Sequence, residues 1–219
     1  MSIALSLGNN LTTGGIFKPA AVNNTSVNNV TDFAGIASGG TLVLLSTQTA
    51  SASASISFTS GIDSTYDEYI FKFINCHPAT DQVSFDFNGS TDGGSNYNVT
   101  KTTTWFEAYH DEADTSTTLQ YRTDLDLAQS TSFKKLGHFI GNDNDQSGSG
   151  YLHLFAPSST TYVKHFIAVS QNSHGGDYSY NNFAAGYFNT TSAINAIRFQ
   201  MSSGNIDDGI IKMYGVAKS

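Results

Sequence analysis

The chain has 219 residues and a net charge of -8 at pH 7, and only 13% of its residues are charged. Its ten Lys and Arg residues form no basic run, so direct binding to a phosphate backbone is disfavoured. A single cysteine, Cys76, excludes an internal disulfide, and there is no CxxC pair, HExxH motif or GxSxG elbow. We therefore expect a protein without cofactor, metal ion or catalytic residues, held together by packing alone.

Residues 1–40 combine many Gly and Asn residues with isolated apolar residues. Such a segment buries too little apolar surface to fold by itself, so we interpret it as an extended N-terminal attachment arm. Its apolar residues recur at intervals, which favours a tether that docks on a neighbouring subunit over a terminus without a role. The candidate docking residues are Ile16, Phe17, Val22, Val27, Val30 and Phe33.

The first residues carry no Lys or Arg ahead of their short apolar run, so they lack the charged front of a secretory signal. No stretch approaches the roughly 18 apolar residues that a membrane span requires. We expect synthesis in a cytoplasm and no membrane insertion.

From residue 41 to residue 219 the pattern changes to short runs in which apolar and polar residues alternate, separated by Gly, Asn, Asp and Ser. Alternation with a period of two is typical of strands with one buried face. The predicted strands are 41–46, 55–60, 67–74, 82–88, 102–109, 132–140, 150–156, 161–169, 183–188, 193–201 and 209–216. The segment 170–182 is predicted to be a surface loop, and 110–121 is the nearest candidate for a brief helix.

Strands without intervening helices exclude a parallel sheet, because parallel neighbours need long crossover connections. The prediction is an all-β fold, an antiparallel jelly-roll-like β-sandwich at residues 41–219 behind the extended N-terminal arm at 1–40. Phe71, Phe85 and Phe199 should meet in its interior.

Glu107 and Asp111 lie close to Trp105, Phe106 and Tyr109 in the sequence. Two carboxylates beside aromatic rings would suit a glycosidase, but a strand of aromatic residues is more often part of a core or an edge. We favour ligand stacking over catalysis here, and core packing over both. The candidate ligand-stacking residues are Trp105, Tyr109, Tyr178 and Tyr180.

The loop GNDNDQSGSG at 141–150 resembles the start of a calcium loop through Asp143, Asp145 and Gly148. The motif also requires a Glu at its twelfth position, where this chain has Leu154. A solvated turn is the favoured interpretation, with a single bound cation as the alternative.

Five segments together carry a resemblance to a family of proteins. They are 42–75 (LVLLSTQTASASASISFTSGIDSTYDEYIFKFIN), 87–98 (FNGSTDGGSNYN), 126–133 (DLAQSTSF), 141–166 (GNDNDQSGSGYLHLFAPSSTTYVKHF) and 189–216 (NTTSAINAIRFQMSSGNIDDGIIKMYGV). In phrase and pattern, about four fifths of the chain resembles small virion structural proteins of marine tailed bacteriophages of the cyanophage type. No catalytic signature lies in these segments, so no functional residue carries over.

The resemblance implies a non-enzymatic component of a virion, either a tail or fibre appendage or a head decoration protein. Its partners would be other virion proteins and further copies of the chain, with a trimer favoured because closed symmetry protects edge strands. The alternative function is a carbohydrate-binding module that attaches the particle to a host surface glycan. A polysaccharide-degrading enzyme is the weakest hypothesis, since only Glu107 and Asp111 motivate it.

Overall fold

Alternation with a period of two is clear along most of the long strands of the computed structural model, which describes residues 42–217. In β3, for example, the side chains of Tyr69, Phe71 and Phe73 are buried, while Lys72 between them is exposed. The strands are β1 (Leu42–Ser53), β2 (Ile56–Phe58), β3 (Glu68–Pro78), β4 (Val83–Ser90), β5 (Lys101–Asp111), β6 (Thr117–Tyr121), β7 (Leu127–Ser130), β8 (Lys134–Ile140), β9 (Gly148–Phe155), β10 (Lys164–His174), β11 (Tyr178–Phe188), β12 (Ala196–Met201) and β13 (Ile206–Val216).

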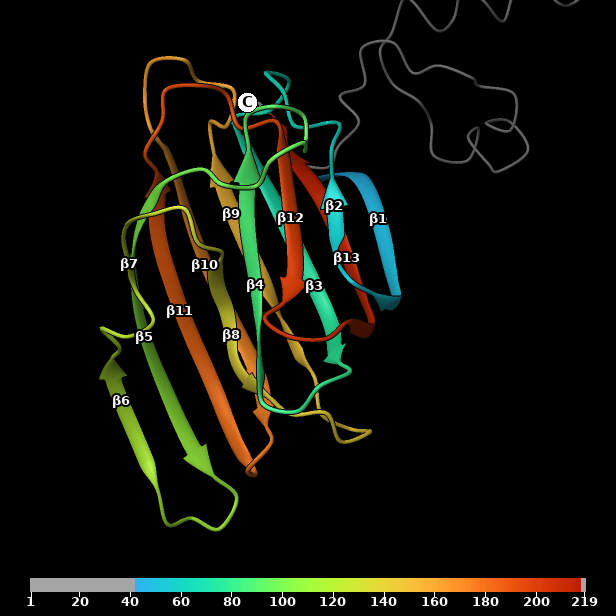
Figure 1. Cartoon of the computed structure of the whole chain (residues 1–219), viewed down its shortest axis with the longest axis vertical. Helices are drawn as coiled ribbons and strands as arrows, with labels where there is room; N and C mark the ends of the chain where they lie inside the picture. Colours follow the sequence, from blue (N-terminus) through green and yellow to red (C-terminus); the bar gives the residue numbers. More distant parts are fainter. Residues whose placement is uncertain (1–41, 218–219) are drawn as a thin grey trace, which may run out of the picture. The chain divides into compact units, whose positions relative to one another are not determined.

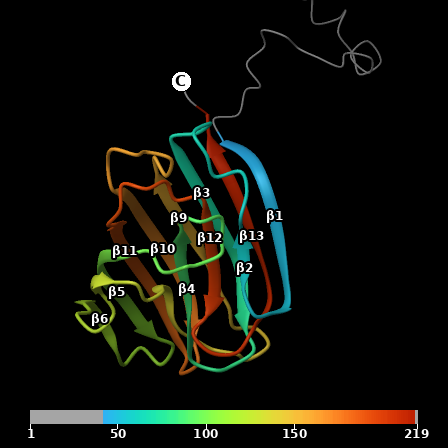
Figure 2. The ribbon, with the colours of Figure 1, turned by 45° about the horizontal axis from the view of Figure 1, so that its top comes forward.

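The strands form two layers of one nearly closed antiparallel sheet (Figure 1). The back layer has the order β1-β13-β3-β9-β10-β11-β5, and β6 and β7 both pair with the far side of β5. The front layer has the order β8-β4-β12-β2. Figure 2 shows the front layer lying over one face of the back layer, with β1 and β6 on opposite sides. The predicted all-β antiparallel fold is confirmed.

The two layers meet along both sides of the sandwich through few contacts. On one side β8 pairs with β10 only at Ile140 and His174. On the other side, the Gln48 amide of β1 donates a hydrogen bond of 3.0 Å to the Ser57 carbonyl of β2. Between these seams the sandwich is closed by packing, as the aromatic core shows.

Aromatic rings from both layers fill the interior under β4 and β12. Phe199 stacks on Phe85 with ring centroids 5.7 Å apart, and its centroid lies 5.5 Å from that of Phe71. Phe87 packs edge to face on Phe166, with centroids 5.0 Å apart. The predicted meeting of Phe71, Phe85 and Phe199 is confirmed, and burial of these rings is the main favourable term for the domain.

Every predicted strand coincides with an observed one, but two segments were wrongly predicted. The candidate helix at 110–121 is instead the end of β5, a turn, and β6, which pairs with β5 from Phe106↔Tyr121 to His110↔Thr117. Asp111 decides this, because its carboxylate accepts hydrogen bonds from the backbone N–H groups of Thr115 and Ser116 and so closes a hairpin turn.

The second wrong prediction is the loop at 170–182. There β10 and β11 continue and meet at a tight turn, in which the N–H of Asp177 donates to the carbonyl of His174. The predicted arm at 1–40 and its docking residues lie outside the described residues.

Candidate functional site

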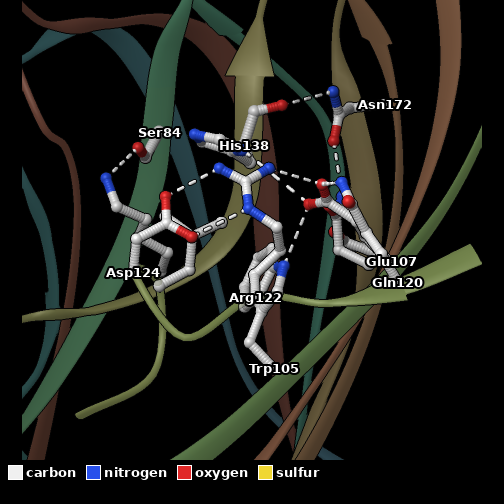
Figure 3. Close-up of polar contacts among 12 residues, drawn as sticks. Ser84, Trp105, Glu107, Gln120, Arg122, Asp124, His138 and Asn172 are labelled. Atoms are coloured by element: carbon white, nitrogen blue, oxygen red, sulfur yellow. Dashed lines mark hydrogen bonds and ion pairs between the residues drawn. The ribbon is translucent and has the colours of Figure 1, made fainter.

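Glu107 is the centre of a buried polar cluster between the layers (Figure 3). Its side chain has no solvent exposure and lies on the inner face of β5. Arg122 donates to it at 2.6 Å, Gln120 at 3.0 Å and the Trp105 indole N–H at 3.0 Å. The His138 Nδ1 atom lies 3.8 Å away, and Arg122 also forms two hydrogen bonds with Asp124.

The contacts of Glu107 fix its ionisation. Burial opposes the charged carboxylate, but the neighbouring His138, Trp105, Arg122 and Gln120 side chains outweigh burial and lower its pKa to about 2. The carboxylate is therefore charged at neutral pH and occupied by its neighbours. Gln120 lies in β6 and Arg122 directly follows it, so the cluster fastens the β6 hairpin to the sandwich.

Asp111, the second carboxylate of the glycosidase hypothesis, has a separate local role. It holds the turn before β6 through Thr115 and Ser116, and these hydrogen bonds lower its pKa. Both carboxylates thus have structural partners. These partners argue against the hypothesis, made from sequence, that the two carboxylates act as a pair on a glycosidic bond.

Polar side chains also join the two layers where backbone pairing is sparse. Ser170 of β10 donates to the Leu136 carbonyl of β8 at 2.5 Å, and Asn172 donates to the His138 carbonyl at 3.0 Å. Asn182 of β11 donates to both Ser170 and Asn172. These buried side chains replace hydrogen bonds that the β8–β10 backbone lacks, which explains why a Ser- and Asn-rich segment is strand and not loop.

Three lysine side chains, Lys101, Lys134 and Lys164, are fully buried. Lys134 donates to the Leu125 carbonyl at 2.7 Å, and its Nζ atom lies 4.7 Å from the centre of the Trp105 ring. Lys101 and Lys164 each donate to two backbone carbonyls. Burial lowers the pKa of Lys101 and of Lys134 to about 7. These amines tie loops to the sheet at the cost of a pH-dependent stability.

The candidate stacking residues separate into one buried ring and one aromatic group. Trp105 is fully buried, so it offers no face to a ligand in this structure. Tyr109 and Tyr180 stack on each other with centroids 4.9 Å apart, and Tyr178 packs edge-on against Tyr109 at 5.6 Å. His174 stacks on Tyr180 at 5.0 Å. The three predicted tyrosines therefore lie together, and their rings pack mainly against one another.

A polar groove of about 330 Å³ lies next to Tyr178, at the β10–β11 turn. Its lining consists of hydroxyl, amide and carboxylate groups with one aromatic ring: Glu112, Ser147, Ser149, Gln171, Asn172, Ser173, Tyr178 and Ser179. Gln171 and Ser179 are already oriented by a mutual hydrogen bond of 2.8 Å. Such a mixture suits a small polar ligand.

The outer face of the back layer is unusually apolar for a face that no described strand covers. Strand register aligns its side chains in three rows. The Lys72 row contains Lys212, Lys72, Tyr151, Val169, Phe183 and Phe106. The central row contains Leu44, Tyr214, Ile70, His153, Ile167, Ala185 and Thr104. The Glu68 row contains Glu68 and Phe155, then His165, Tyr187 and Thr102.

Several of these side chains are large and solvent-accessible. Ile167 is 49% exposed, Phe106 is 42% exposed and Tyr151 is 39% exposed. Phe106 and Phe183 stack face to face with centroids 4.5 Å apart. A sheet face that meets water normally carries polar residues at these positions, so this face is the leading candidate for an interaction surface.

A shallow groove of about 450 Å³ interrupts the outer face beside the Phe106–Phe183 pair. Ala185, a small side chain in the central row, lines it together with Ile167, His165 and Tyr187, and the Gly186 backbone also reaches it. A Cβ atom at Gly186 would lie 2.4 Å from the Thr102 carbonyl oxygen, so close strand packing requires glycine there. The face therefore carries a projecting aromatic pair next to a depression.

Comparison with protein-family models, curated proteins and solved structures finds no match. Within residues 42–217, no three His, Cys, Asp or Glu side chains are grouped so that they would hold a metal ion. In the same residues no helix is long and apolar enough to cross a membrane.

The outer face was not identified as a surface from sequence. Its rows appear only when the register of separate strands is known, since each strand contributes one or two of its apolar residues. One signal was present in the sequence. In β9, β10 and β11 apolar residues occur at both odd and even positions, so that Tyr151, Ile167 and Phe183 alternate with buried residues.

We expect Arg122→Ala to lower the free energy of unfolding by about 3 kcal/mol, because it leaves the buried Glu107 carboxylate without its charged partner. Urea unfolding followed by fluorescence measures this. Asp124→Asn is the matched control, since Asp124 is 63% exposed and its pairing with Arg122 should contribute no more than about 1 kcal/mol. Equal losses in the two variants would contradict the role assigned to Glu107.

Lys134→Met should stabilise the domain more at low pH than at high pH. In the folded chain the pKa of Lys134 is about 7, below its ordinary value of 10.5, so burial of the charged amine is most costly below pH 7 and the cost disappears as the pH rises towards 10.5. The gain of the variant over the unmodified chain should shrink by on the order of 3 kcal/mol between pH 6 and pH 10.

Urea midpoints at pH 6, 8 and 10 test this expectation. Leu136→Met, a neutral change in the core of the same strand, serves as control and should have the same effect at every pH. A pH-independent effect of Lys134→Met would show that the buried amine does not titrate in this range.

Proposed function

We propose that this chain is a non-enzymatic structural protein of a bacteriophage particle, a tail or fibre appendage or a head decoration component. It assembles through the outer face of its back layer. The observation that carries the proposal is the exposed apolar surface of the Lys72 row and the central row. The virion as its location rests on the resemblance noted in the sequence.

Contact with water is unfavourable for the apolar side chains of this face. Apolar area contributes roughly 25 cal/mol per Å² when it is removed from water, so covering side chains such as Ile167 and Phe106 favours association. Isolated exposed apolar residues are ordinary, but here they lie in adjoining rows on neighbouring strands. Such a face is expected in a protein whose neighbours in an assembly cover it.

A structural role also agrees with the contacts that these polar groups make. Glu107 and Asp111 hold the β6 hairpin, and Lys101, Lys134 and Lys164 bond to backbone carbonyls. Glu107, Lys101 and Lys134, whose pKa values are strongly shifted, therefore serve to fix loops and strands. Other virion proteins and further copies of this chain are its proposed partners.

Purified particles should contain the full-length chain, detectable by electron microscopy with a label at its C-terminus. Full-length Phe106→Ser/Ile167→Ser should be incorporated at less than about a tenth of the unmodified level, because the change removes two exposed apolar side chains of the outer face. Quantitative mass spectrometry of the particles provides the measurement.

Tyr162→Ser is the matched control, since Tyr162 is 73% exposed but lies in the loop between β9 and β10, outside the three rows. Circular dichroism establishes that each variant is folded. Absence of the chain from purified particles would refute the proposed function, and normal incorporation of the double variant would refute the role of the outer face.

The polar groove beside Tyr178 favours a second candidate function, binding of a host surface glycan. Its hydroxyl and amide groups can bond to sugar hydroxyls, and Tyr178 supplies an aromatic edge. Glu112 and the net charge of -8 favour a neutral saccharide over an acidic one.

A glycan array probed with the full-length protein tests this candidate. Tyr178→Ala and Gln171→Ala should each reduce binding of a neutral glycan by about tenfold or more, because each removes part of the groove wall. Tyr162→Ala, a change at a 73% exposed tyrosine outside the groove, should have no effect. Binding to no glycan on the array, or binding that both groove variants retain, would exclude it.

A further inference from the structure

We propose that the outer face binds a second copy of the same face, related by a twofold axis that runs across the strands along the central row. This inference rests on the proposed assembly through the outer face and names the partner. It is argued from the order of side chains within the three rows, above all from the charges on β3.

The three rows are arranged symmetrically about the central row. On β3 the outward side chains are Glu68, Ile70 and Lys72 in that order, with Ile70 in the central row. A half turn about an axis along the central row places each strand over the same strand of the second copy. It also lays the Lys72 row of one copy over the Glu68 row of the other.

The charges become complementary under this rotation. Lys72 of each copy faces Glu68 of the other, so two ion pairs form per dimer. In the single chain, Lys72 Nζ lies 5.7 Å from the centre of the Tyr214 ring, and Glu68 is bonded to His153 Nδ1. Neither contact joins Lys72 to Glu68, and only one carboxylate oxygen of Glu68 is used by His153. Opposite charges at matching positions fix the register of such a contact.

The shapes of the rows are complementary as well. On β11 the rotation places Phe183 of one copy over Tyr187 of the other, next to the groove lined by Ala185 and Gly186. On β5 the same rotation places Phe106 over Thr102, a small side chain at the edge of that groove. On β9 it brings Tyr151 over Phe155, an aromatic pair. Facing sheets pack with strands nearly aligned, which keeps the central rows in contact.

This contact is isologous, so it closes at two copies and leaves no outer face open. The twofold pair replaces the trimer expected from sequence as the smallest assembly unit. From strand and residue spacings the three rows on β3, β9, β10, β11 and β5 cover on the order of 500 Å² per copy. That is below the roughly 800 Å² per partner of a standard interface and in the range of weak, reversible contacts, for which we expect a dissociation constant on the order of 10 µM.

Charge reversal on β3 tests the inference. In full-length protein, Lys72→Glu places two carboxylates against each other in both pairs, and Glu68→Lys does the same with two ammonium groups. Sedimentation equilibrium should show the dimer dissociation constant raised by more than about tenfold in each variant alone. An equimolar mixture of the two variants should dimerise within about threefold of the unmodified protein, because both mixed pairs regain opposite charges.

Lys212→Glu is the matched control. Lys212 lies beside Lys72 in the same row, but no acidic residue lies two positions beyond the central row on its own strand, where Val216 stands. Lys212→Glu keeps both Lys72–Glu68 pairs, so it should leave the dimer dissociation constant within about threefold of the unmodified value. Circular dichroism of each variant confirms that the sandwich is folded.

A monomer at all concentrations up to about 200 µM would overturn the inference, since the expected dissociation constant lies well below that concentration. So would charge-reversed variants that dimerise as well as the unmodified chain, or a mixture without recovery. A monomeric chain that still enters particles would leave the proposed function standing, whereas a dimer absent from particles would do the reverse.

Discussion

The register of the back layer is the constraint on which the rest of the structure depends. Because successive side chains point to opposite sides of a strand, fixing the pairing of β10 with β9 and β11 assigns every residue of those strands to one face. A slip of one residue would move Phe166 to solvent and bring Ile167 inside. Both the aromatic core and the rows of the outer face exist only in the observed register.

Two kinds of interior hold this register. Under β4 and β12 the inner side chains are aromatic, and contacts such as Phe85–Phe199 secure the front layer by burial. Towards β8 and β5 the inner side chains are polar, and hydrogen bonds from Ser170, Asn172 and Arg122 take over. Directional bonds add specificity that apolar contacts lack, at the cost of desolvating charged groups. The polar half thus fixes β8 and the β6 hairpin in one arrangement.

Much of the fold could be predicted from sequence, because the long strands alternate clearly. The short strands β6 and β7 could not, since Thr117–Tyr121 and Leu127–Ser130 expose most of their side chains and bury no apolar face. The extensions of β10 and β11 were wrongly predicted as loop because Ser170, Asn172 and Asn182 are buried through hydrogen bonds that only the folded chain provides. Composition alone could not separate these residues from turn residues.

The candidate site was only partly predictable for the same reason. Alternation correctly placed Trp105 and Glu107 on one face, but it could not say that this face is interior, where the indole donates to the carboxylate. The three tyrosines at positions 109, 178 and 180 were named together and do lie together, because β5 and β11 pair through Tyr109↔Tyr180. The outer face needed the registers of several pairs of strands and therefore lay beyond sequence reasoning.

The central claim is that β9, β10 and β11 have one face that is always buried and another that is buried on assembly. Hydroxyl-radical footprinting of the purified chain across a concentration series tests it most directly. We expect Phe166 and Phe188 to stay protected at every concentration, while Ile167, Phe183 and Tyr187 lose reactivity as concentration rises. Equal reactivity of Phe166 and Ile167 would contradict the register, and outer-face residues unaffected by concentration would contradict burial of that face on assembly.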